Sequence, residues 1–174
     1  MKRLIGGLLM LSAVLVQVTW ASRIEVAGAF PNLVLLAVIA LTWTAGVRSG
    51  LVWACVGGLL LDLTAPGPLG PHALALLAGA YVSGFWARNL TRETARFPAM
   101  AAAVSTVLYS LILVGADAWL GLPVPPFRLA IQLTAAASVY NALLMPLAVA
   151  PLRSLQARMQ PKIQSSMRHR PSTA

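Results

Sequence analysis

Charged residues are scarce in this chain, and their scarcity decides its class. Of 174 residues, only 10% are charged, while 59% are hydrophobic. An ordinary soluble domain carries about 25% charged residues, so a water-soluble fold of this composition would leave much of its surface apolar. The sequence therefore excludes a typical soluble domain and predicts an all-α membrane protein with several spans.

Cysteine and acidic side chains are almost absent as well. The one cysteine, Cys55, excludes an intrachain disulfide and a cysteine-based metal site, and its apolar neighbours favour a packing role. Phosphate-binding loops, HExxH and Ser-His-Asp arrangements are missing from the sequence. We therefore expect no catalytic residue, no metal and no cofactor in a chain whose only acidic residues are Glu25, Asp62, Glu93 and Asp117.

Basic residues give the chain a net charge of +9, but they stand at the ends of apolar runs rather than in one patch. This spacing argues against nucleic-acid binding and marks out membrane helices instead. The first run favours a retained helix over a cleaved signal peptide, because Thr19-Trp20-Ala21 is a poor cleavage site. We predict six transmembrane helices over residues 4–22, 26–47, 49–63, 71–87, 97–116 and 129–152.

The distribution of lysine and arginine predicts the orientation of these helices. With six spans, all 13 basic residues except Arg23 and Arg128 fall on the side of the N-terminus. This is the cytoplasmic side by the positive-inside rule, so both termini are expected in the cytoplasm. Residues 1–152 would form the transmembrane domain. Residues 153–174 would form a basic tail, either disordered or docked on anionic lipid headgroups.

Asp62 interrupts the third apolar run, and a Pro-Gly cluster follows it. A carboxylate inside hydrocarbon costs about 3 kcal/mol on the mild insertion scales, so it needs partners. One interpretation is that Asp62 accepts N–H groups from the 64–71 turn and caps a buried hairpin. A compatible one is that it lines an outward-facing polar cavity or a partner surface. His72 begins the returning helix, where it either reaches Asp62 or is simply solvated.

Small residues four positions apart indicate where helices approach closely. Ala54 and Gly58 form such a pair, as do Ala75 and Gly79. Gly57-Gly58 would make the third span a thin central helix. These faces either pack within the bundle or receive a partner's helix. In the sixth span, Asn141 is expected to bond another helix.

The stretch GGLLLDLTAPGPLGPHAL at 57–74, preceded by FPNLVLLAVIALTWTAGVRSGLVWACVGG at 30–58, resembles the MreD family of rod shape-determining membrane proteins. The resemblance covers most of the chain. Asn32 departs from the pattern, because the family commonly has Asp after this proline. Some of these residues carry the resemblance and others the packing argument. Together they are the candidate partner-binding or structural positions: Pro31, Gly58, Asp62, Pro66, Gly67, Pro68, Gly70 and His72.

The resemblance implies a non-enzymatic scaffold in the bacterial cytoplasmic (inner) membrane that maintains rod shape and directs peptidoglycan synthesis. Its implied partners are membrane lipids, the single-span protein MreC, the actin-like MreB, and the polymerase RodA with its penicillin-binding transpeptidase. The implied fold is similar to the substrate-binding subunits of energy-coupling-factor transporters. The alternative function is therefore that of a substrate-binding subunit of a small-molecule, vitamin-type transporter.

Overall fold

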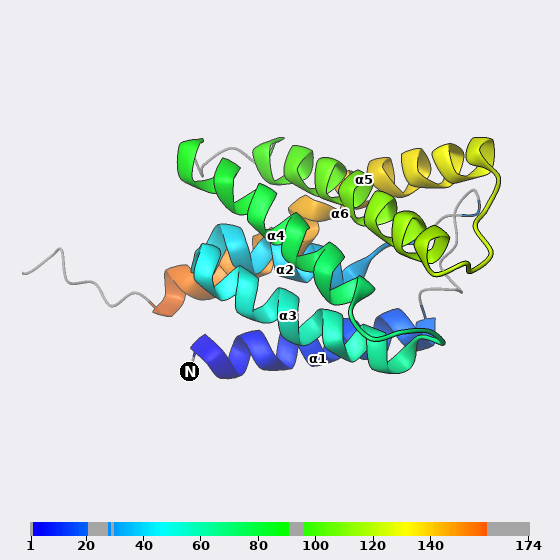
Figure 1. Cartoon of the computed structure of the whole chain (residues 1–174). Coiled ribbons are helices and arrows are strands. Elements are labelled where there is room, and N and C mark those ends of the chain that lie inside the picture. The colour runs from blue at the N-terminus through cyan, green and yellow to red at the C-terminus, as the bar shows by residue number, and fades with distance from the viewer. Residues whose placement is uncertain (1, 21–27, 29, 91–95, 160–174) are drawn as a thin grey trace, which may run out of the picture.

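The computed structural model describes residues 2–20, 28, 30–90 and 96–159, which contain six α-helices and no strand. The helices form a bundle, and the α3–α4 hairpin, the start of α2 and the α5–α6 connection lie at one end of it (Figure 1, right). This arrangement confirms the predicted all-α fold with six helices. Their bounds are α1 Lys2–Trp20, α2 Leu33–Ala45, α3 Val47–Thr64, α4 Pro71–Asn89, α5 Arg96–Trp119 and α6 Phe127–Met159.

Within the described ranges, only three helices are long and apolar enough to cross a membrane. They are Val47–Thr64, Arg96–Trp119 and Phe127–Ser154. The prediction of six such helices is therefore wrong in length or composition for the other three. α2 has 13 residues and rises about 20 Å, short of the roughly 30 Å hydrocarbon core. It begins at Leu33 rather than at Val26, because Asn32 acts as its N-cap.

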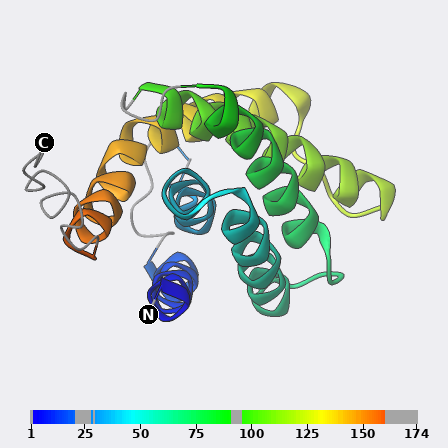
Figure 2. The same cartoon turned by 90° about the vertical axis from the view of Figure 1, so that its left-hand side faces the viewer.

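α2 is the central helix of the bundle. The sequence had predicted this position for α3, because of its Gly57-Gly58 pair, and that prediction is wrong. It packs against all five other helices, and its residues from Val34 to Trp43 are buried (Figure 2). Its ends are fixed locally. The Asn32 side chain accepts the Leu35 N–H, and Gly46, with φ of 97°, stands at the C-cap. The uniform hydrophobicity of α2 thus reflects burial by protein on every side.

α3 packs between α1 and α4, and small residues bring it close to both. Gly6 and Gly7 of α1 lie against the Trp53 indole, which leaves no room for a Cβ at Gly6. This contact explains a tryptophan placed well inside the apolar helix. Cys55 is exposed on the outer side of α3, so its predicted packing role is wrong.

The small-residue faces of α3 and α4 pack inside the bundle. Ala54, Ala75 and Ala80 are fully buried. Gly84 lies against Val47, and Gly79 lies against Leu35 and Ser105. Of the two roles proposed for these faces, close packing between the chain's own helices is therefore the one that the structure shows.

α6 continues through Pro146 and Pro151 to Met159, past the end predicted at Leu152. The backbone beyond the predicted domain boundary is thus helical as far as the structure describes it. The prediction of a disordered or lipid-bound tail concerns mainly residues 160–174, which lie outside the described residues.

Candidate functional site

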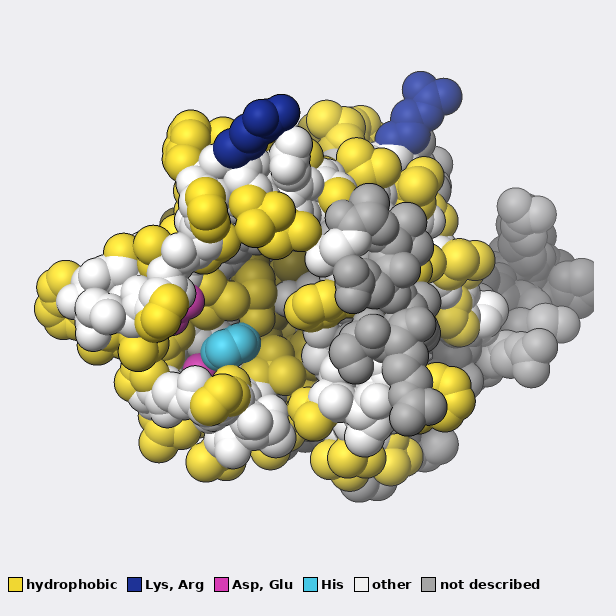
Figure 3. All heavy atoms as spheres, turned by 90° about the vertical axis from the view of Figure 1, so that its right-hand side faces the viewer, with side chains coloured by type: hydrophobic (Ala, Val, Ile, Leu, Met, Phe, Trp, Pro, Cys, Tyr) yellow, Lys and Arg dark blue, Asp and Glu magenta, His cyan; other side chains and the backbone are white. Residues whose placement is uncertain are grey.

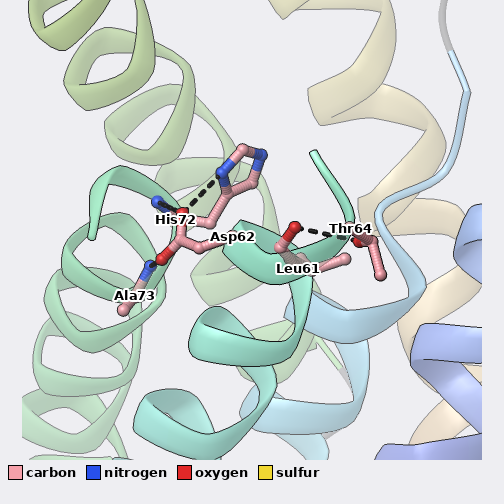
Figure 4. Close-up of polar contacts among 5 residues, drawn as sticks. All are labelled: Leu61, Asp62, Thr64, His72 and Ala73. Carbon is pink, nitrogen blue, oxygen red and sulfur yellow. Dashed lines mark hydrogen bonds and ion pairs between the residues drawn. The ribbon is translucent and has the colours of Figure 1, made fainter. Parts of the chain in front are cut away.

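Asp62 lies on the last turn of α3, with its carboxylate buried against the start of α4 (Figure 4). Its Oδ1 accepts the backbone N–H of His72 at 2.9 Å, and its Oδ2 accepts that of Ala73 at 3.2 Å. Oδ1 also lies 2.9 Å from Nδ1 of the His72 ring. One buried carboxylate thus holds three groups at the beginning of the next helix.

These bonds are with the first turn of α4 rather than with the 64–71 turn. α4 begins at Pro71, so the N–H groups of His72 and Ala73 have no partner within the helix. A carboxylate that accepts them also interacts favourably with the positive end of the helix dipole. Asp62 therefore caps α4 from a neighbouring helix, and the structure brings His72 to it.

The hairpin itself presents its Pro-Gly residues outward. Pro66, Gly67 and Pro68 are exposed. Gly70 is the N-cap of α4 with φ of 122°, a left-handed conformation that favours glycine. Pro71 follows at the first helical position, where its missing N–H costs no bond.

A second polar cluster surrounds the start of α2. The N–H of Asn32 donates to Oδ1 of Asn141 on α6, and the N–H of Leu33 donates to Oε1 of Gln17 on α1. The Asn141 amide in turn donates to the Thr106 hydroxyl on α5. The predicted bond of Asn141 to another helix is therefore confirmed. Pro31, immediately before this cluster, is fully buried.

Tyr109 of α5 links the two clusters. Its hydroxyl lies near the Asn32 side chain, and its ring meets the His72 ring edge-on at a centroid distance of 6.1 Å. The sequence analysis missed Tyr109, Thr106 and Gln17, because single polar residues on separate apolar helices share no spacing. Their only signal was that polar groups inside such helices need partners.

The two clusters line a cavity of about 470 Å³ at the hairpin end of the bundle. Figure 3 shows this end hollowed, with mostly hydrophobic side chains inside and a histidine on the wall. Asn32, His72, Thr106, Tyr109 and Asn141 are on its polar side. Its apolar side includes Leu61, Leu113, Val114 and Leu133.

A separate apolar groove of about 380 Å³ runs between α1 and α6, with α2 as its floor. The described parts of α1 and α6 do not pack against each other, so the groove separates them. Leucine, valine, alanine and proline line it, with Ser12 as the one hydroxyl. The Ser12 hydroxyl donates a hydrogen bond to the Leu9 carbonyl of its own helix.

The described residues contain no group of three or more His, Cys, Asp or Glu that could hold a metal ion. Their buried polar side-chain atoms all have partners, and these bonds join helices or cap them. Long apolar helices joined by buried polar bonds are typical of a membrane protein. Among protein families, rod shape-determining protein MreD matches residues 1–120. The chain therefore belongs to the MreD family, whose role is the determination of rod shape.

No curated protein and no solved structure matches the chain. The expected similarity to the substrate-binding subunits of energy-coupling-factor transporters is thus without support. The family match ends at residue 120 and therefore does not include α6, which begins at Phe127.

Proposed function

We propose that this protein is a non-enzymatic scaffold of the bacterial cell-elongation machinery that binds MreC in the cytoplasmic membrane. Family membership supports a role in rod shape. The observation that carries the binding role is the open groove between α1 and α6. Through MreC the protein would act with MreB, RodA and the penicillin-binding transpeptidase, and so direct peptidoglycan synthesis.

The groove has the chemistry that a single foreign membrane helix requires. Small side chains allow close approach of two helices, and the groove presents Ala13 on its α1 wall and Ala148 on its α6 wall. The remaining lining is apolar, so an inserted apolar helix would leave no polar group unpaired. MreC, as a single-span protein, would supply one such helix.

Filling this groove is expected to weaken MreC binding without unfolding the bundle. Ala148 is half-buried in the groove wall, and a phenylalanine there has the open groove to occupy. Ala148→Phe should lower the recovery of MreC with the purified protein about tenfold, which corresponds to about 1.4 kcal/mol. Quantitative co-purification from native membranes, at matched levels of both proteins, measures this.

Ala150→Phe is the matched control, because Ala150 is exposed on the same helix and does not line the groove. It should recover as much MreC as the unchanged protein. Equal recovery with both variants would exclude the groove as the MreC site. Equal loss would mean that any bulky residue on this part of α6 interferes.

The proposed membrane placement keeps both termini in the cytoplasm and the α3–α4 hairpin outside. Leu69 is exposed in the hairpin. In a Cys55→Ala background, Leu69→Cys should react with an impermeant maleimide added to intact spheroplasts, and Arg92→Cys should not. The reverse labelling pattern contradicts this orientation.

A further inference from the structure

The cavity at the hairpin end has the size of a small-molecule site, about 470 Å³, within the range of about 300–1,000 Å³ that such sites span. Its wall comes from several helices and the hairpin, so the bundle forms it without a partner chain. Most of its lining is apolar, and its polar residues include His72, Tyr109 and Asn32, with the hydroxyls of Thr64, Ser110 and Thr134 elsewhere on the wall. A cavity of this kind suits an amphiphile with a polar head at one end.

The charges around the cavity restrict that head. Neither lysine nor arginine lines it among the described residues, so a phosphate or carboxylate would have no cation to pair with. The N-termini of α2 and α4 beside it are already capped. Asp62 holds the first N–H groups of α4, while Gln17 and Asn141 accept those at the start of α2. An anionic head therefore finds no lysine, no arginine and no unused backbone N–H of α2 or α4 there.

Two side chains are placed to bond a neutral head. His72 directs Nδ1 to Asp62, which leaves Nε2 as the ring atom available to a ligand. The Tyr109 hydroxyl lies near the Asn32 side chain, and both residues line the cavity. The Asp62 carboxylate itself is covered, with 0% of its side chain exposed, and so acts on a ligand only by holding His72.

We propose that this cavity binds an uncharged single-chain amphiphile. Its hydroxyl or amide head lies against His72 and Tyr109, and its chain lies along Leu113 and Leu133. This inference is independent of MreC binding, because the cavity and the α1–α6 groove share no lining residue.

Photolabelling of the full chain in nanodiscs tests the proposal. One probe is a monoacylglycerol with a diazirine on its chain. The other is the fatty acid with the same labelled chain, used at a pH where it is ionised. The monoacylglycerol should label residues of α5 or α6 on the cavity wall, and excess unlabelled monoacylglycerol should displace it. The fatty acid should label these positions at least about tenfold less.

Leu113→Trp fills the cavity and should abolish the displaceable label. Leu111→Trp is its control, because Leu111 is on the same helix, is exposed, and is outside the cavity. Tyr109→Phe keeps the ring and removes one hydrogen bond, so it should weaken displacement by about 2- to 10-fold. Thermal unfolding of each variant confirms that it remains folded.

Three results would overturn the proposal: equal labelling by the two probes, labelling that excess ligand does not displace, or an unchanged label in both Leu113→Trp and Tyr109→Phe. If Leu113→Trp fails to fold, Tyr109→Phe decides. Recovery of MreC is measured on the same variants. It should be unchanged by them, so failure of the ligand site and failure of the scaffold role give different results.

Discussion

Replacing Asp62 by alanine is expected to destabilise the protein by about 2–4 kcal/mol, because it removes the cap of α4 and leaves buried N–H groups without an acceptor. The N–H of Ala73 is buried beneath α3, and water does not replace its lost partner. His72 loses both its backbone bond and the group that holds its ring. Thermal and denaturant unfolding in nanodiscs measure the effect.

Asp62→Asn is expected to lose less than Asp62→Ala. The amide keeps one acceptor oxygen, so it satisfies either the His72 side or the Ala73 side of the pair. Its NH₂ group then faces a donor at the other position, so the cap is only partly restored. Asp62→Leu suits lipid best but offers no acceptor and adds volume at a buried site. The expected order of stability is therefore Asn, then Ala, then Leu.

Complementation of cell shape by the same variants separates capping from transport. If Asp62 carried a proton or cation through a transporter, asparagine would be as inactive as alanine, since charge would then be required. With capping, the asparagine variant retains part of the function at matched membrane levels. Asp117→Asn on α5 serves as a control carboxylate that caps no helix start. Equal loss of function in the asparagine and alanine variants would contradict the cap.

Replacing Gly58 by leucine is expected to prevent stable folding. A Cβ at this position would stand 2.7 Å from the Ala73 backbone nitrogen and still nearer to its Cα. Both atoms belong to the α4 backbone, so α3 and α4 would have to separate. Overpacking of a tight core costs about 1–3 kcal/mol or more. The separation would also draw Ala73 away from Asp62, which is one helical turn further along α3.

Gly115→Ala provides the control for Gly58. Gly115 is in α5, and a Cβ there meets nothing within 4 Å. Alanine at that site should leave stability unchanged or raise it by up to about 1 kcal/mol through helix propensity. Membrane yield and melting temperature of Gly58→Ala, Gly58→Leu and Gly115→Ala test the comparison. A Gly58→Ala variant as stable as Gly115→Ala would show that the two helices are not held in this contact.

The residues that could be interpreted from the sequence are those whose local chemistry is unusual. Asp62 in an apolar run, with a Pro-Gly break after it, predicted a carboxylate that accepts N–H groups beside a hairpin. Asn141 in the last helix predicted a bond to another helix. In each case a polar group in hydrocarbon requires a partner, so the need is visible even when the partner is not.

The sequence could not show which helix lies at the centre. The glycines of α3 suggested a thin central helix, whereas they serve its contacts with α1 and α4. Apolar residues are favoured both where protein covers a helix and where lipid does. Cys55, which is exposed, and the α2 residues, which are buried, therefore look alike in sequence. An outward-facing cavity was one of the two interpretations of Asp62, but Asp62 is not among the residues that line the cavity. Its walls could not be predicted, because they depend on tertiary contacts such as that between Asn32 and Asn141, which are 109 positions apart.

The enclosure of α2 has a consequence for biogenesis. α2 leaves the ribosome before α4, α5 and α6, which later cover it, so at first it has only α1, lipid and the translocon around it. Every face of this helix must therefore be compatible with two successive environments, lipid during insertion and protein afterwards. A polar substitution such as Ile39→Asn would act at the first of these stages, and its main effect would be degradation of the nascent chain.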